Sequence, residues 1–192
     1  MAHLPRRRFV LELAAFLPLP FVARRLHSRA VADLDPRQLR ALASATLPGE
    51  LGPDGVNRVV TSFERWLLGY REGVELVHGY GTGELRHTGP SPALRWSAQL
   101  RELEASARKQ GHSFEQLGLD DRQALVRSAL EGQRGTGLPP VDRAPHLAIG
   151  MLAFFYGSPE ATDLCYQARI GSNACRPLAD SPQRPLPLAR RS

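Results

Sequence analysis

The chain has 192 residues, with 25 lysines and arginines against 19 acidic residues and a formal net charge of +6. The first 32 residues hold six arginines and one glutamate, which leaves a net charge of about +1 for the rest of the chain. Only one basic residue is a lysine and the charges are interspersed, so nucleic acid is not expected as a partner. About 160 residues remain after position 32, enough for one domain with its own core.

The N-terminus has the basic start and the short apolar stretch of an export signal. Arg6 and Arg7, followed after one residue by Phe9, resemble the twin-arginine pattern. The apolar stretch at 10–22 contains Glu12 and two prolines, and its 13 residues fall short of the roughly 20 that a membrane-spanning helix needs. We therefore expect an export signal rather than a permanent anchor.

A cleavage site is expected at the A-x-A triplet that ends at Ala32. Arg24 and Arg25 lie just before it, which hinders the general secretory route and suits the twin-arginine route. Residues 1–32 are therefore predicted to be a twin-arginine signal peptide, and the mature chain to be periplasmic. Membrane contact is then expected only through partners or an uncleaved signal. The alternative is the basic N-terminus of a cytosolic protein.

The clearest helix start is the stretch LDPRQL. Asp35 suits the N-cap, Pro36 the first helical position and Gln38 the capping-box position. Leu34 and Leu39 bracket this cap as a hydrophobic staple. We expect a helix to begin here.

Further helix starts follow along the chain. In LDDRQAL, Asp120 is the predicted cap with Gln123 three residues on, while Ser91 and Ser158 each precede a proline. The stretch 146–157 is apolar almost all round and is predicted to be the most buried helix. The residues predicted to form buried helical faces, spaced mostly three or four apart, are Val59, Phe63, Trp66, Leu67, Tyr70, Val74 and Val77, then Leu94, Leu100 and Leu103, then Leu125, Ala129 and Leu130.

No stretch alternates with the period of two that strands between hairpin turns would show. The sequence therefore predicts an all-α fold, a single compact domain of five to six helices at residues 33–178. The last residues, 179–192, are rich in proline and arginine and are predicted to be a flexible tail.

The usual catalytic and cofactor motifs are missing from the sequence. The G-x-G-x-G run at 79–83 follows a helical pattern rather than a strand and lacks dinucleotide-loop spacing. His146 lies near the cysteines, but no two histidines have the spacing of a zinc-binding helix, so a capping or core histidine is the simpler interpretation. No nucleophile elbow or haem motif occurs. We expect no catalytic, metal-binding or cofactor-binding residue in this chain.

The two cysteines, Cys165 and Cys175, lie ten positions apart, and no second pair exists to complete a four-cysteine zinc site. In an oxidising compartment the default is a disulfide, and closing this loop would stabilise the fold by roughly 2.5–3 kcal/mol. A helix from Pro159 that ends near Gly171 would let the chain fold back for the bridge. The alternatives are a disulfide to a partner, free thiols, a metal site or redox chemistry.

Large aromatic side chains are the candidates for a binding surface. Trp, Tyr and Arg dominate the energetic centres of protein interfaces. An arginine-rich helical chain with Trp66, Tyr70 and Tyr156 and no catalytic constellation fits a binding role. These three residues are the candidate partner interface. In a stand-alone periplasmic binding protein they would instead line a ligand pocket.

Three stretches together bear a family resemblance: ERWLLGYREGVELVHGYGTGELRHTGPSPALRWSAQLREL, SFEQLGLDDRQALVRSAL and MLAFFYGSPEATDLCYQARIGSNACRPL. With the twin-arginine start, they resemble the gluconate 2-dehydrogenase subunit 3 family. The resemblance covers most of residues 34–178, and its most distinctive part is the block SPEATDLCY.

The resemblance implies a non-catalytic small subunit whose partner is the FAD-dependent large subunit of a sugar or sugar-acid dehydrogenase. In that family the partner holds FAD, sometimes with an iron–sulfur cluster, and has no export signal of its own. The small subunit takes the folded pair through the twin-arginine system, and electrons pass to a cytochrome c subunit at the membrane. The competing hypotheses are a stand-alone periplasmic ligand-binding protein and a redox or metal enzyme that uses the two cysteines.

Overall fold

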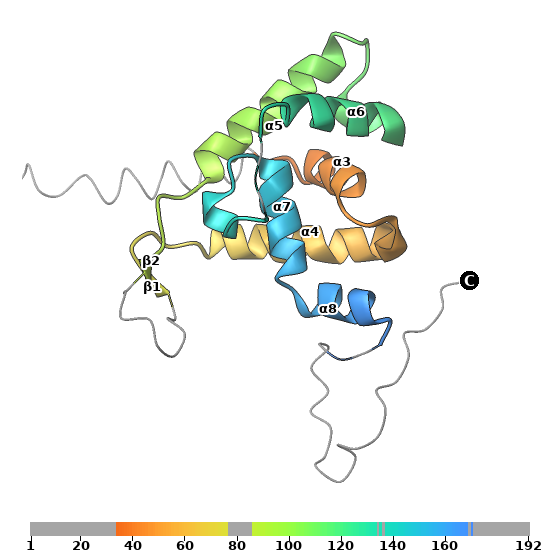
Figure 1. Ribbon diagram of the computed structural model, residues 1–192. Coiled ribbons are helices and arrows are strands. Elements are labelled where there is room, and N and C mark those ends of the chain that lie inside the picture. Colours follow the sequence, from red (N-terminus) through yellow and green to blue (C-terminus); the bar gives the residue numbers. More distant parts are fainter. Residues whose placement is uncertain (1–33, 77–85, 134, 136, 169, 171–192) are drawn as a thin grey trace, which may run out of the picture.

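The part of the chain described by the computed structural model consists of residues 34–76, 86–133, 135, 137–168 and 170 (Figure 1). The predicted signal peptide, the G-x-G-x-G run, Cys175 and the predicted tail lie outside this part. Within it the chain forms one domain of six α-helices, which confirms the predicted all-α fold.

The six α-helices are α3 (Pro36–Thr46), α4 (Gly52–Leu68), α5 (Ala93–Arg108), α6 (Leu119–Ala129), α7 (Leu147–Tyr156) and α8 (Pro159–Tyr166). Short 3-10 helices in the connections are η1 (Gly49–Leu51), η2 (Phe114–Gln116) and η3 (Val141–Arg143). The one β pair in the described residues joins β1 (Glu75–Leu76) and β2 (Arg86–His87), antiparallel, with Glu75 opposite His87. Strands of two residues are too short to leave an alternating pattern in the sequence.

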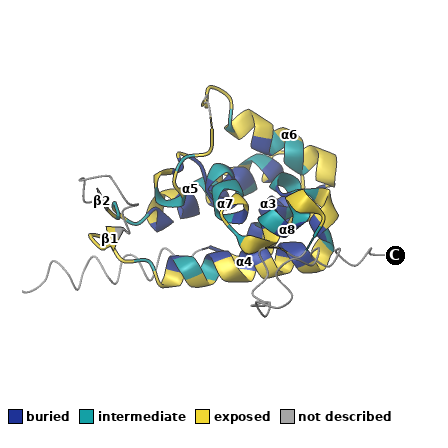
Figure 2. Ribbon diagram, turned by 60° about the horizontal axis from the view of Figure 1, so that its bottom comes forward, coloured by how far each residue is buried: buried dark blue, intermediate teal, exposed yellow. Residues whose placement is uncertain are grey.

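Helix α7 lies at the centre of the array because it is apolar on every side. It packs against α3, α4, α5 and α8, and Figure 1 shows it running across α4 toward α8. Every α7 residue except Tyr156 is buried or half-buried. The prediction that 146–157 is the most buried helix is confirmed. Helices α4 and α5, in contrast, bury one side and expose the other (Figure 2).

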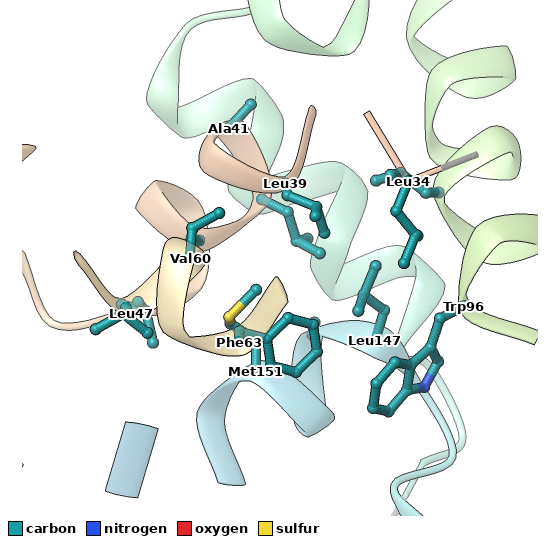
Figure 3. Close-up of a cluster of buried hydrophobic side chains, with 14 of the residues drawn as sticks. Leu34, Leu39, Ala41, Leu47, Val60, Phe63, Trp96, Leu147 and Met151 are labelled. Atoms are coloured by element: carbon teal, nitrogen blue, oxygen red, sulfur yellow. The ribbon is translucent and has the colours of Figure 1, made fainter. Parts of the chain in front are cut away.

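The core gathers around Phe63 of α4, Trp96 of α5 and Met151 of α7, with leucines from α3 and α7 beside them (Figure 3). Phe63 and Trp96 are fully buried, and their rings stack with centroids 5.4 Å apart. Gly150 lets α7 approach α5, because a Cβ atom there would lie 2.7 Å from Cζ2 of Trp96. This close contact fixes the spacing of the two helices at the centre of the core.

Two predicted helix caps are confirmed. At the start of α3, Oδ1 of Asp35 accepts the N–H of Arg37 at 2.8 Å. At the start of α8, Oγ of Ser158 accepts the N–H of Ala161 at 3.2 Å. Each bond satisfies an amide that the first helical turn leaves open, a stabilisation of about 1 kcal/mol.

The predicted starts of α5 and α6 need correction. Helix α6 begins at Leu119 with Gly118 as its N-cap, so the predicted cap at Asp120 is wrong. Asp120 lies instead in the first turn, where an acidic side chain interacts favourably with the helix dipole. Helix α5 begins at Ala93, one residue later than predicted, although Oγ of Ser91 still accepts the Ala93 N–H at 3.3 Å.

The predicted buried face from Val59 to Val77 holds only as far as the end of α4. That helix ends at Leu68, so Tyr70 and Val74 lie beyond it, and Val74 is 47% exposed. The chain leaves the helix because its backbone bonds instead to the arm of the hairpin that contains β2. Val77 lies outside the described residues.

Two other predicted apolar faces are only partly right. Leu94 is 56% exposed, whereas Leu100 and Leu103 are buried as predicted. On α6, Ala129 is exposed and Val126 is the buried residue. A short amphipathic helix with few apolar residues leaves its buried row ambiguous until its neighbours are placed.

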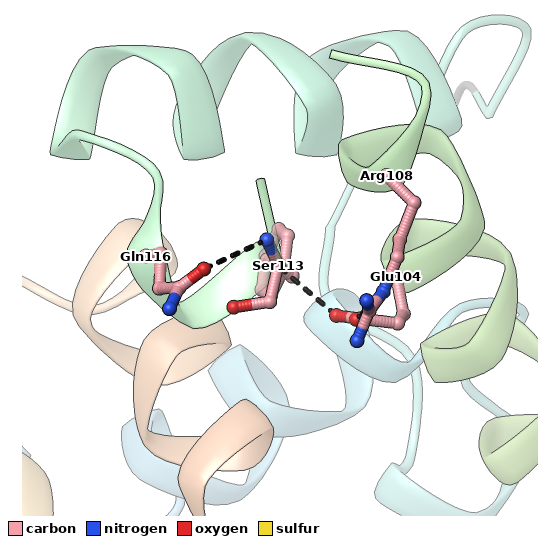
Figure 4. Close-up of polar contacts among 5 residues, drawn as sticks. Glu104, Arg108, Ser113 and Gln116 are labelled. Carbon is pink, nitrogen blue, oxygen red and sulfur yellow. Dashed lines mark hydrogen bonds and ion pairs between the residues drawn. The ribbon is translucent and has the colours of Figure 1, made fainter. Parts of the chain in front are cut away.

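Contacts of Glu104 hold the connection between α5 and α6 (Figure 4). Its Oε1 accepts a bond from Nε of Arg108 at 2.8 Å, and its Oε2 accepts the N–H of Phe114 at 2.9 Å. The N–H of Ser113 donates to Oε1 of Gln116 at 3.2 Å. These bonds fix the turn at which the chain folds back from α5 into α6.

Two side chains of α5 hold the segment that leads into α7. Nη2 of Arg95 donates to the carbonyl of Ala144 at 2.7 Å. Nε2 of Gln99 donates to the carbonyl of Pro145 at 2.8 Å, and its Oε1 accepts the N–H of Leu147 at 2.8 Å. The position of α7 therefore depends on α5 as well as on apolar packing.

Candidate functional site

An open groove of about 430 Å³ lies between α4, α7 and α8. Trp66 of α4 and Phe154 and Phe155 of α7 give it an aromatic wall, so we call it the aromatic groove. The first turn of α8 closes another side. The described residues that line it are Arg58, Val59, Ser62, Trp66, Val141, Ala153, Phe154, Phe155, Gly157, Ser158, Pro159 and Glu160.

The wall from α4 is a row of residues spaced by one helical turn. Arg58, Ser62 and Trp66 are four residues apart, so they lie on one side of the helix. Behind them, the buried Phe63 ring lies 5.8 Å from the ring of Trp66 and 5.3 Å, edge to face, from that of Phe154. Trp66 and Phe154 are half-buried, so the core holds part of each ring in place while both residues line the groove.

The first three residues of the SPEATDLCY block, Ser158, Pro159 and Glu160, form the wall from α8, and this helix is shorter than predicted. The buried Asp163 carboxylate accepts the N–H of Ile170 through Oδ1 at 2.6 Å. Gln167 adopts the left-handed region, with φ of 51°. Both features end α8 at Tyr166, so the predicted end near Gly171 is wrong.

Three large side chains at the ends of α7 and α8 are exposed. Tyr156 is 50% exposed, Tyr166 is 69% exposed and Ile170 is 50% exposed. Tyr156 lies in the chain between two groove residues, and its ring is 5.1 Å from that of the buried Phe155. An exposed aromatic side chain beside a groove, as Tyr156 is, is typical of interaction surfaces.

The α8 helix also presents Cys165, which is exposed. Its predicted partner Cys175 lies outside the described residues, so the disulfide stays a prediction. Among the described residues, no three His, Cys, Asp or Glu side chains are grouped in a way that could hold a metal ion. None of the helices in that part is long and apolar enough to span a membrane.

The three predicted interface residues have different positions. Trp66 lines the groove and Tyr156 borders it, but Tyr70 is not part of the lining. The Tyr70 ring lies edge-on to Trp66 at 5.4 Å, and its hydroxyl donates to the carbonyl of Gly89 at 2.7 Å. Burial, with a smaller effect of Asp142, raises the pKa of Tyr70 to about 12. Tyr70 therefore connects the end of α4 to the segment before α5.

Arg58, Ser62 and Glu160 are groove residues that were not predicted from the sequence. A signal was available for the first two, because their four-residue spacing to Trp66 places all three on one side of a helix. Glu160 offered no such signal, since it reaches the groove only through the turn at Gly157 that sets α8 against α7.

His146 acts as the cap of α7. It is 5% exposed, and its Nδ1 accepts the N–H of Ala148 at 3.1 Å. Burial lowers the pKa of His146, and the nearby Glu102 carboxylate opposes this shift. The interpretation of this residue as a capping histidine is confirmed.

The role of the groove has to be inferred from its own residues, because comparisons with known proteins give no match. No protein-family model, curated protein or solved structure matches the chain. The groove offers aromatic ring faces, apolar carbons, and the exposed charges of Arg58 and Glu160 at its edge. Such a surface is suited to binding another molecule.

Proposed function

We propose that the chain is a non-catalytic accessory subunit of an FAD-dependent sugar or sugar-acid dehydrogenase. It binds the flavoprotein subunit and carries it through the twin-arginine export system. FAD, with an iron–sulfur cluster in some complexes, belongs to that partner, and a cytochrome c subunit is the electron acceptor. The observation that carries the proposal is the aromatic groove, because Ser158, Pro159 and Glu160, which begin the SPEATDLCY block that distinguishes the resemblance, form one of its walls.

The groove has the properties of a protein-binding surface. Half-buried Trp66 and Phe154 are fixed by ring contacts with centroids 6.0 Å apart, so little side-chain entropy is lost when a partner covers them. Arg58 and Glu160 supply charges of opposite sign at the edge, where charged groups set orientation. Exposed Tyr156 extends the apolar surface beyond the groove.

The need for an export carrier has an independent physical reason. A flavin is inserted while the enzyme folds, so the holoenzyme has to cross the membrane folded. The twin-arginine route accepts folded cargo, and one signal can therefore serve two chains that bind before export. Arg6 and Arg7 would supply that signal.

The first test is co-purification of the tagged full chain, expressed together with its neighbouring genes. We expect it to recover a yellow flavoprotein. Ser62→Arg places a long cationic side chain in the groove without touching the core and should lower flavin recovery by roughly tenfold or more. The matched control is Thr61→Arg, the exposed neighbour on α4 outside the groove lining, which should recover as much flavin as the unmodified chain.

The outcomes separate the parts of the proposal. A tag that recovers only its own chain under mild conditions contradicts the accessory-subunit role. Equal recovery with Ser62→Arg and Thr61→Arg removes the groove as the binding surface. Changing Arg6 and Arg7 to lysine should leave both chains in the cytoplasm, and continued export of the flavoprotein would contradict the carrier role.

The groove volume of about 430 Å³ favours one other candidate, a stand-alone binding protein for a small molecule. This candidate predicts a stable monomer whose melting temperature rises when the molecule is added. Ser62→Arg would abolish that rise in melting temperature. Co-purification of the unmodified chain would then recover no flavoprotein.

A further inference from the structure

A second pocket of about 430 Å³ lies between α3, the start of α4 and α6. Arg37 and Arg40 of α3 and Arg122 of α6 line it, so we call it the arginine pocket. Among the described residues that line it, Glu115 of η2 is the only acidic one. The charged side chains of this described lining therefore sum to about +2, whereas residues 33–192 together carry a net charge of about +1.

Arg122 is held in place by hydrogen bonds to α3. Its Nη1 donates to the carbonyl of Ala41 at 3.1 Å and to Oγ of Ser44 at 2.7 Å. Nη2, the other terminal nitrogen, makes no hydrogen bond to any described residue. The buried Nε also has no hydrogen-bond partner among the described residues. The guanidinium is thus oriented by contacts with α3, while the described residues leave part of its hydrogen-bonding capacity unused.

The two arginines of α3 complete the pocket. Arg37 and Arg40 are three residues apart, so they lie on the same side of α3, and both are exposed. Neither forms an ion pair with a described residue. Three guanidinium groups around one hollow repel one another, and an oxyanion between them relieves that repulsion. Guanidinium groups match the two oxygens of a carboxylate with parallel hydrogen bonds.

Besides the charged residues and the polar Ser44 and Asn57, the described lining is apolar or glycine. Leu47, Pro48, Pro53 and Val56 form the wall beside the arginines. An inorganic anion would leave this wall without a contact, whereas a carboxylate attached to apolar carbons would cover both the wall and the charges. The first turn of α4 also lies here, and its positive dipole end favours a negative charge.

We propose that the arginine pocket binds a carboxylate attached to an apolar group. The ligand is either a free carboxylic acid or an acidic side chain between apolar residues on another polypeptide. The site is separate from the aromatic groove and does not depend on the proposed function, since α4 contributes different residues to the two surfaces.

The test is calorimetric titration of the purified full chain with two probes. One is 3-phenylpropionate, a free carboxylate on an apolar body, and the other is the tripeptide Leu-Glu-Leu with both ends blocked. We expect saturable binding of at least one probe. The double variant Arg37→Gln/Arg40→Gln should weaken that binding by roughly tenfold or more, because it removes two charge-assisted contacts. Arg122 is left unchanged because it connects α6 to α3.

The matched control is Arg65→Gln/Arg127→Gln, which removes the same charge from exposed positions on α4 and α6 outside the pocket. It should bind the probes as the unmodified chain does. Binding of 3-phenylpropionate alone identifies a free acid as the ligand, and binding of the tripeptide alone identifies a polypeptide. The proposal is overturned if neither probe binds, or if the two double variants weaken binding equally.

Discussion

At the residue scale, His146 makes the start of α7 sensitive to pH. Its Nδ1 can accept the Ala148 N–H only while that nitrogen is unprotonated, and burial lowers the pKa of the imidazole. The unfolded chain therefore binds this proton more readily than the folded chain does. Its contribution to stability is complete above the ordinary histidine pKa of about 6.5 and declines as the pH falls from there toward the folded pKa.

We therefore expect the unfolding free energy to fall between about pH 7.5 and pH 5, in part through His146. His146→Asn keeps a side chain that can cap the helix but does not titrate, so its stability should depend less on pH over this range. Urea unfolding of both proteins at the two pH values measures the difference. His112→Asn changes an exposed histidine and should keep the full pH dependence. An unchanged pH dependence in His146→Asn would rule out this cap as the sensor.

At the element scale, the starts of α3 and α8 follow from local chemistry, whereas the ends of α4 and α8 depend on contacts made beyond each helix. The caps Asp35 and Ser158 are readable from the sequence because each bonds an amide two or three residues away. The end of α4 depends on Tyr70, whose hydroxyl bonds Gly89, 19 positions further along the chain. The end of α8 depends on the carboxylate of Asp163. No local spacing encodes either contact.

The candidate groove was predictable only in part, for the same reason. Trp66 and Tyr156 belong to an aromatic set visible in the sequence, but a groove exists only where α4, α7 and α8 approach one another. That approach follows from the central position of α7. Gly150 allows α7 to contact Trp96 of α5, a packing constraint that appears only once the helices are placed.

The α8 helix gives a prediction of its own, because it has only eight residues and so relies on its cap. Ser158→Ala should cost about 1 kcal/mol and loosen the wall of the groove that α8 forms. Amide hydrogen exchange should then accelerate in α8 while α7 stays protected. Ser128→Ala, an exposed serine on α6, is the control and should leave exchange in α8 unchanged. Unchanged exchange in Ser158→Ala would show that packing alone holds α8.

At the scale of the whole molecule, one core connects all six helices. Buried apolar residues from α3 to α8 belong to a single cluster, and rings from α4, α5 and α7 interlock within it. Polar contacts reinforce the same arrangement, since Glu104 holds the α5–α6 turn and Arg122 joins α6 to α3. We therefore expect the described domain to lose its core in one global step, even though a short helix such as α8 can open locally.

We therefore expect unfolding in urea to be a single cooperative transition. The chain has two tryptophans, Trp66 in the wall of the groove and Trp96 in the core, so tryptophan fluorescence reports on the centre of the fold. Far-UV circular dichroism reports on all the helices together. The two signals should give the same midpoint. In Trp66→Phe, fluorescence reports Trp96 alone and should still coincide with the helical signal. A fluorescence midpoint that differs from the midpoint of the circular dichroism signal would mean that the aromatic centre and the outer helices unfold independently. In that case, binding at the groove could not be transmitted to α3 and α6 through a common core.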